Sequence, residues 1–172
     1  RRITGQRKIG HTGTLDPMAT GVLPLLLGNA TRAESLLPDT NKEYRAGFCL
    51  GMATDTQDST GTILETWDRP VSQKELDEVL DAFRGPILQV PPMYSALKQD
   101  GKKLYELARQ GIVVERPARP VTIYSLELLS YDPQTRRGEF RVSCSGGTYI
   151  RTLCADIGEK LGMGGVMTSL RR

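Results

Sequence analysis

Residues 10–21 bring the only histidine of the chain, one carboxylate and several turn-forming residues into a short segment, GHTGTLDPMATG. The glycines and the proline disfavour a helix, and they also disfavour the interior of a strand. A tight turn that presents Asp16 suits the segment better, because Gly13 can adopt a positive φ angle and Pro17 favours extended backbone at the residue before it. The residue types leave two interpretations: an ordinary loop in which Asp16 caps a turn, or a loop that offers a carboxylate for catalysis.

Tyr44 and Arg151 are two further side chains with candidate roles in chemistry. Tyr44 belongs to residues 42–50, which alternate in the pattern of a strand, so it could equally be a core aromatic residue. Arg151 falls in the first turn of a helix expected over residues 148–161, outside the apolar stripe of that helix. Because a helix N-terminus is electropositive, an arginine there is disfavoured unless an anion lies nearby. Arg151 is therefore either the partner of an anion or an ordinary surface residue.

Five segments of the chain resemble the TruB family of pseudouridine synthases, and the resemblance covers essentially all 172 residues. The matching segments read GHTGTLDPMATGVLPLLLGNATR, KEYRAGFCLGMATDTQDSTG, PPMYSALK followed by GKKLYELARQG, CSGGTYIRTL and SLRR. The first match is long and ungapped, so it is far more specific than a lone glycine motif. The resemblance implies the pseudouridine synthase fold, with one catalytic domain over residues 1–172. It also implies that an N-terminal strand is missing here and that the full protein carries a C-terminal RNA-binding PUA domain.

The same resemblance assigns roles to individual residues. It implies that Asp16 is the catalytic carboxylate and that Arg151 pairs with it. Tyr44 would stack on the target base, and Leu170 would form an apolar wall of the base pocket. His11 would sit in the RNA loop at the place from which the target base was flipped, although on its chemistry alone a lone histidine could equally be a core hydrogen-bonding residue.

Residues 101–111 predict an amphipathic helix that carries Lys102, Lys103 and Arg109. Taken alone, this pattern is typical of a solvated surface helix. The resemblance places the helix in an RNA-binding insertion over about residues 92–120. Its lysine and arginine side chains would then contact phosphates and fix the register of the RNA without reading its sequence.

The remaining pattern predicts an α+β fold with a mixed, largely antiparallel central sheet and flanking helices. A capping box that begins at Ser72 opens a helix running to about residue 84. Residues 121–131 and 138–145 read as the two strands of a hairpin. The other expected elements are a buried strand over residues 22–27, a strand over residues 62–67, and a short helix that is capped by Asn29 or Thr31, runs to Leu37 and is stopped by Pro38.

The composition excludes several classes of protein. The 172 residues carry a formal net charge of +3, and no apolar run approaches the ~20 residues of a membrane span. Three widely spaced cysteines and one histidine indicate neither a zinc site nor a disulfide framework, which fits a cytoplasmic protein with reduced thiols. Asp55 and Asp58 lack the spacing of a calcium loop and are interpreted as turn residues. Basic residues are in excess towards both ends of the chain, so a nucleic acid would lie against the ends rather than the acidic middle.

The resemblance implies an isomerase that converts uridine to pseudouridine at position 55, in the T-loop of tRNA. That reaction needs a carboxylate beside the ribose–base junction and no cofactor or metal, and the sequence carries neither a P-loop nor a dinucleotide-binding motif. The expected partner is the tRNA T-stem-loop, no membrane partner is expected, and the protein is expected to be a monomer. Two alternatives stay open: a non-catalytic module for RNA binding or tRNA folding, and a dyskerin-like enzyme that uses a guide RNA to modify ribosomal RNA.

Overall fold

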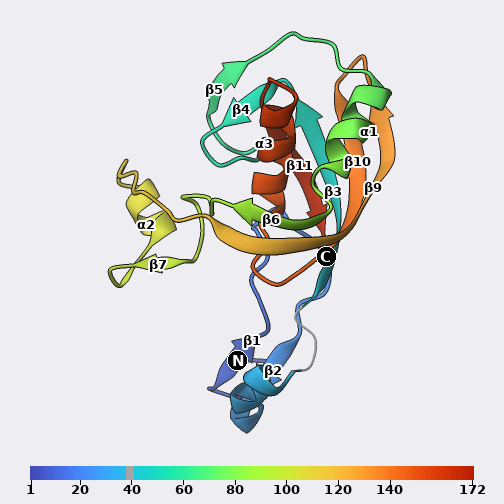
Figure 1. The fold of residues 1–172 in the computed structure, drawn as a ribbon. Coiled ribbons are helices and arrows are strands. Elements are labelled where there is room, and N and C mark those ends of the chain that lie inside the picture. The colour runs from blue at the N-terminus through green and yellow to red at the C-terminus, as the bar shows by residue number, and fades with distance from the viewer. Residues whose placement is uncertain (38–40) are drawn as a thin grey trace.

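A five-stranded sheet forms the centre of the computed structural model, which describes residues 1–37 and 41–172 (Figure 1). Its strand order is β11-β3-β10-β9-β6, and every neighbouring pair runs antiparallel. The strands are β3 (Lys42–Leu50), β6 (Gly85–Gln89), β9 (Arg119–Asp132), β10 (Arg137–Cys144) and β11 (Gly165–Arg171). The predicted α+β fold with a largely antiparallel sheet is confirmed.

Two helices, α1 (Gln73–Asp81) and α3 (Ile150–Lys160), pack against the sheet and complete the main core (Figure 1). Phe48 of β3 stacks on Phe140 of β10, with ring centroids 5.5 Å apart. The apolar stripe predicted for α3 is buried in this core, namely Ile150, Leu153, Cys154, Ile157 and Leu161. Removing this aromatic and aliphatic surface from water is the main source of stability for the sheet and helix layers. Among the residues that the structure describes, no helix has the length and apolar character needed to cross a membrane.

Several local predictions agree closely with the structure. Helix α1 starts where the capping box predicts, because Ser72 Oγ accepts a hydrogen bond from the backbone N–H of Glu75 at 3.2 Å, but the helix ends at Asp81 instead of near residue 84. Strands β9 and β10 form the predicted hairpin. The strand expected over residues 62–67 is β5 (Ile63–Thr66), which pairs with β4 (Met52–Thr54). The sequence pattern predicts neither β6 nor β11.

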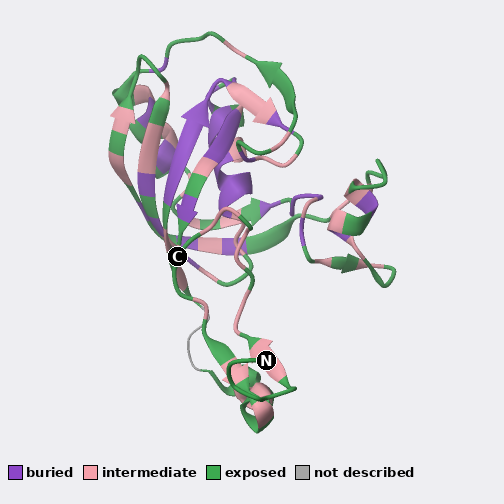
Figure 2. Ribbon diagram, turned by 180° about the vertical axis from the view of Figure 1, so that it is seen from behind, coloured by how far each residue is buried: buried purple, intermediate pink, exposed green. Residues whose placement is uncertain are grey.

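An arm of short elements projects away from the sheet near the N-terminus (Figure 1). In this arm β1 (Ile9–His11) pairs with β2 (Leu25–Leu27). The prediction of a buried strand over residues 22–27 is wrong, because the strand covers only the last three of these residues and Leu25 is 59 % exposed. Figure 2 shows that exposed residues predominate in the arm. The two strands pack mainly against the short 3₁₀ helix at Gly28–Leu36 among the described elements, which is too little to bury their apolar side chains in a core.

The helix predicted after β2 is a 3₁₀ helix, η1 (Gly28–Leu36). Its N-cap is Leu27, and no side chain caps it. The expected cap at Asn29 or Thr31 is wrong, since Thr31 lies inside the helix and its hydroxyl donates to the carbonyl of Gly28 at 2.9 Å. Pro38, the predicted stop, lies outside the described residues.

Residues 93–114 form a small unit of their own beside the sheet, with Met93, Leu104 and Leu107 buried at its centre (Figure 1). It contains β7 (Lys98–Gln99), β8 (Lys102–Lys103) and α2 (Leu104–Ala108). The helix predicted over residues 101–111 is therefore too long. Its first turn is instead the second strand of a short hairpin, in which Lys102 and Lys103 pair with the residues of β7.

A pH dependence of stability is expected from Asp156, a half-buried residue of α3. Burial, and secondarily the nearby negative charge of Glu159, raises the pKa of Asp156 to about 6. The folded state therefore binds this proton more tightly than the unfolded chain does, and stability falls as pH rises from about 4 to about 7. Asp156→Asn should raise the free energy of unfolding at pH 7.5 and leave it unchanged at pH 4, as measured by urea unfolding. The exposed Asp77→Asn is the control, and an equal effect of both variants at pH 7.5 would contradict the prediction.

Candidate active site

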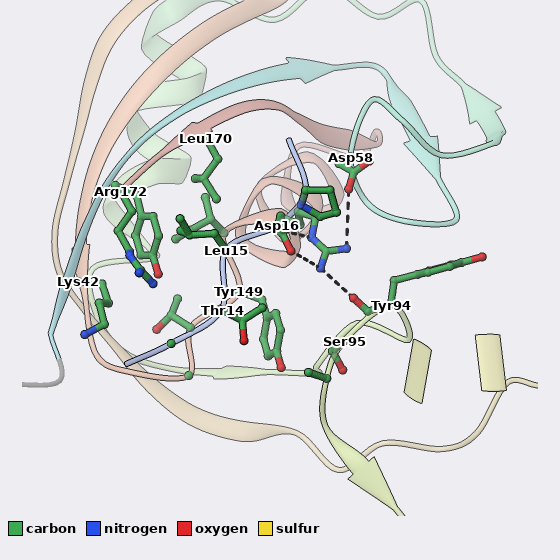
Figure 3. Close-up of a pocket in the computed structure, with 18 of the residues that line it drawn as sticks. Thr14, Leu15, Asp16, Lys42, Asp58, Tyr94, Ser95, Tyr149, Leu170 and Arg172 are labelled. Carbon is green, nitrogen blue, oxygen red and sulfur yellow. Dashed lines mark hydrogen bonds and ion pairs between the residues drawn. The ribbon is translucent and has the colours of Figure 1, made fainter. Parts of the chain in front are cut away.

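Asp16 and Arg151 form a bidentate ion pair on the wall of a cleft (Figure 3). Arg151 Nε donates to Asp16 Oδ2 at 3.0 Å, and Nη2 donates to Asp16 Oδ1 at 3.1 Å. The two planar groups match in the parallel arrangement that makes arginine–carboxylate pairs both strong and directional. The carboxylate is thus held in one orientation, while 28 % of its side chain stays accessible for a ligand.

The Arg151 guanidinium is itself almost wholly enclosed by protein, with 5 % of the residue exposed. Nη1 donates to the carbonyl of Thr56, and Nη2 to the carbonyl of Tyr94, each at 2.9 Å. Nη1 also lies 3.8 Å from Asp58 Oδ2. Acceptors thus surround all three nitrogens of a group with five N–H donors. The guanidinium is therefore arranged to orient Asp16 rather than to bind a ligand directly.

Arg151 lies outside the apolar stripe of its helix, as predicted, but the interpretation of Arg151 as an ordinary surface residue is wrong. Arg151 is the second residue of α3, and the side of the helix that faces away from the main core is covered by the turn over residues 54–60 and by Tyr94. At the electropositive N-terminus of α3, the Asp16 carboxylate pairs with Arg151, which would be disfavoured there without an anion. Sequence periodicity reports only the contacts of one helix face, so it could not show this second layer.

Asp58 is a buried residue that sequence reasoning treats only as a turn former. Its Oδ1 does perform that role, because it accepts hydrogen bonds from the hydroxyl and backbone N–H of Thr60 and from the hydroxyl of Thr56. Its other oxygen faces Arg151. The threonines two residues before and after Asp58 in the sequence are the ones that bond Oδ1, but this local pattern does not reveal the contact of Oδ2 with Arg151.

The loop that carries Asp16 is fixed to the end of β11. Thr20 donates its backbone N–H to the carbonyl of Leu170 at 2.9 Å and accepts from the backbone N–H of Arg172 at 3.0 Å. Gly21 follows with a φ of 123°, and any side chain there would collide with the backbone of Arg172. Only glycine allows this approach. The positions of the catalytic candidate Asp16 and of the cleft residue Leu170 are therefore fixed relative to each other.

Gln89 fixes the other half of the site. Its side-chain amide donates to the carbonyl of Tyr149 at 3.0 Å and accepts from the backbone N–H of Tyr149 at 2.9 Å. Gln89 is 2 % exposed and ends β6, so it ties the start of α3 to the edge of the sheet. A buried glutamine has no distinctive pattern in sequence, so no motif indicates its role.

The cleft beside the ion pair has a volume of about 820 Å³, within the range of sites that take small organic groups. Five of the eight predicted site residues line it: Asp16, Tyr44, Arg109, Arg151 and Leu170. Burial raises the pKa of the Tyr44 phenol, and a hydrogen bond with Arg172 acts in the opposite direction. The ring is thus a neutral, anchored surface at physiological pH, suited to stacking. Among the described residues, no group of three or more His, Cys, Asp or Glu side chains could hold a metal ion.

The other predicted site residues lie outside the lining of this cleft. His11 is exposed in β1, within the arm. Lys102 is exposed in β8, while the Lys103 amine lies 5.3 Å from the centre of the Tyr105 ring. Arg109 lies 5.4 Å from the same ring, so it connects this small cationic and aromatic group to the cleft.

Fold and site together define an α+β domain in which a carboxylate oriented by an arginine lies at a cleft that an aromatic and an apolar side chain also line. The chain belongs to the TruB family: the model described as "TruB family pseudouridylate synthase (N terminal domain)" matches residues 1–150. Among curated relatives, the chain is 55 % identical over 172 residues to "tRNA pseudouridine synthase B" of Aromatoleum aromaticum and 49 % identical over 174 residues to the protein of that name from Clostridium tetani. It covers 55 % and 59 % of these two proteins, so it spans little more than half of their length.

Solved structures give the same fold. The chain resembles one in "Crystal Structure of a Cbf5-Nop10-Gar1 Complex" with a TM-score of 0.72 and 34 % identity, covering 99 % of this chain and 41 % of that one. A chain in "Crystal structure of the archaeal box H/ACA sRNP Nop10-Cbf5 complex" matches with a TM-score of 0.67 and 32 % identity, covering 99 % and 40 %.

Replacing Arg151 by lysine should lower the free energy of unfolding by about 1–3 kcal/mol. The lysine keeps the charge but loses the planar fork, so it cannot serve Asp16 and the carbonyls of Thr56 and Tyr94 together. Arg45 is a matched control, because it forms a bidentate pair with Glu139 on an exposed face of the sheet. Arg45→Lys should cost less than about 1 kcal/mol. Equal destabilisation of the two variants in chemical denaturation would show that burial adds nothing to the Arg151 bonds.

Proposed function

We propose that this protein converts uridine to pseudouridine at position 55 in the T-loop of tRNA. The observation that carries the proposal is the bidentate Asp16–Arg151 pair facing a nucleotide-sized cleft. The chain is about half identical to proteins named tRNA pseudouridine synthase B, and this similarity supports tRNA as the substrate. The proposal concerns the full-length protein, and it includes the predicted cytoplasmic location and monomeric state.

The reaction is an isomerisation with no net redox change. The N1–C1′ bond breaks, the uracil turns, and C5 bonds to C1′; C5 loses its proton and N1 gains one. Asp16 starts this sequence at the ribose–base junction. The bidentate pairing with Arg151 holds this carboxylate in one orientation at the cleft. Arg151 also donates to the carbonyls of Thr56 and Tyr94, which hold its guanidinium in place beside Asp16.

The uridine must leave the RNA stack before Asp16 can reach it. Tyr44 and Leu170 lie on the same side of the cleft, where β3 and β11 pair with Ala46 opposite Leu170. An aromatic ring and an apolar side chain there would hold the extruded uracil, with stacking contributing about 1–3 kcal/mol. The sheet register therefore supports the base-binding roles proposed for these two residues.

Cationic side chains of the unit at residues 93–114 would bind the RNA outside the cleft. Lys102 points to solvent, and Arg109 reaches the cleft rim beside Tyr105. Such groups contact phosphates, which sets affinity and register rather than the rate of bond cleavage. His11, exposed in the arm, is proposed to lie in the RNA loop after base flipping.

Asp16→Asn should abolish pseudouridine formation, because the amide keeps the shape of the side chain but removes the charge. RNA binding should stay within about tenfold of wild type, or roughly 1.4 kcal/mol. A tritium-release assay on a T-stem-loop RNA and a filter-binding assay measure the two effects in full-length protein. Asp68→Asn, at a carboxylate 99 % exposed and remote from the cleft, is the control. Substantial turnover by Asp16→Asn would remove this residue from the chemistry.

Alanine at Lys102, Lys103 and Arg109 together should weaken RNA binding and flatten its salt dependence. For each phosphate of a duplex stem that the variant no longer neutralises, the slope of log K against log salt should fall by up to ~0.9. The single-turnover rate at saturating enzyme should change little, since none of the three side chains contacts Asp16. Lys74→Ala, on the exposed side of α1, should leave the slope unaltered. A wild-type slope in the triple variant would show that these cations are merely solvated.

A further inference from the structure

Ser95 lines the cleft and carries a buried hydroxyl that has no hydrogen-bond partner among the described residues. The residue is 5 % exposed. A buried hydroxyl left unpaired destabilises a fold, so such groups are rare unless a ligand or solvent completes them. Its position in the cleft indicates that the missing partner arrives with the substrate.

The backbone around Ser95 is fixed beside the catalytic pair. Its N–H donates to the carbonyl of Met93 at 2.9 Å, and its carbonyl accepts from the N–H of Tyr105 at 3.1 Å. The preceding carbonyl, that of Tyr94, accepts from the same Nη2 of Arg151 that donates to Asp16. Ser95 is therefore one residue from a direct contact with the pair, and its backbone is held in place rather than carried on a free loop.

The position of Ser95 in the cleft indicates which part of a bound nucleotide its side chain would contact. Figure 3 shows Ser95 and Leu170 on opposite sides of Asp16. If the uracil lies against Leu170 and the C1′ atom lies at Asp16, Ser95 faces the sugar. A neutral serine hydroxyl carries no positive charge to hold a phosphate anion, whereas it can pair with a neutral polar group of the sugar.

We propose that Ser95 binds the substrate by a hydrogen bond between its hydroxyl and the 2′-hydroxyl of the extruded nucleotide. Both groups can donate and accept, so they can pair without a change in charge. The 2′-hydroxyl is also the group by which a protein distinguishes RNA from DNA at a given nucleotide. Ser95 would thus contribute to the choice of ribose over deoxyribose. This assignment rests on the proposed function, since it requires a ribonucleotide at Asp16.

A double-mutant cycle between protein and RNA tests the contact. The dissociation constant is measured for full-length protein with Ser95 or Ser95→Ala, each against a T-stem-loop RNA with uridine or 2′-deoxyuridine at the target position. All four measurements use the Asp16→Asn background, so that no RNA is converted. We expect Ser95→Ala to weaken binding of the uridine RNA about three- to tenfold and binding of the deoxyuridine RNA less than twofold. Equal weakening with both RNAs, or no weakening with either, overturns the assignment.

Two further measurements separate this contact from a structural role and from the proposed function itself. Removing an unpaired buried hydroxyl should leave the melting temperature of Ser95→Ala unchanged or raised, and a lowered value would mark Ser95 as structural. Ser125→Ala, the same change at an exposed position of β9, should alter neither RNA affinity nor its dependence on the 2′-hydroxyl. Wild-type protein that fails to convert uridine in the T-stem-loop RNA would refute the proposed function; conversion without coupling in the cycle would refute only the role of Ser95.

Discussion

The burial of one guanidinium is the constraint on which this structure depends. An arginine withdrawn from water is costly unless acceptors surround it. The acceptors for Arg151 come from three separate segments of the chain: the Asp16 loop, the turn that contains Thr56 and Asp58, and the backbone at Tyr94. Each segment completes part of the shell around the same group. The position of Asp16 is therefore coupled to the stability of the fold, because the segment that presents Asp16 also supplies acceptors that offset the cost of burying Arg151.

The central sheet supplies the frame for these segments through its two edge strands. At one edge, the end of β11 holds the Asp16 loop by backbone bonds to Thr20 and by the close approach at Gly21. At the other edge, Gln89 at the end of β6 fixes the backbone that leads into α3 and Arg151. The two halves of the ion pair are thus anchored to opposite edges of one rigid layer. A sheet with a fixed register can hold a carboxylate and a guanidinium within hydrogen-bond distance although they are far apart in sequence.

The sequence predicts those parts of this arrangement that depend on residues close together in the chain. The cap at Ser72, the β9–β10 hairpin and the apolar stripe of α3 each follow from neighbouring residues, and each is found. The short strands β6 and β11 depend on partners far along the chain, so their own residues do not reveal them. The burial of Arg151 and the second role of Asp58 also come from contacts between separate segments. Residue types single out Asp16 and Arg151 as candidates, but only the family resemblance implies that they pair, because a motif retains information about tertiary contacts that a local pattern lacks.

The segment that begins near Met93 joins the Asp16–Arg151 pair to the surface proposed to bind RNA. It has its own small apolar cluster, separate from the main core, and it supplies the Tyr94 carbonyl to Arg151. Moving this segment away would leave an N–H of a buried guanidinium without an acceptor, at a cost of about 1–3 kcal/mol. The position of the segment and the orientation of Asp16 are therefore linked in free energy, and the linkage acts in both directions. Contacts that hold the segment in place, including those with a bound RNA, stabilise the same arrangement of Arg151 that orients the carboxylate. Binding energy from phosphates distant from the reacting bond can in this way contribute to the geometry at Asp16.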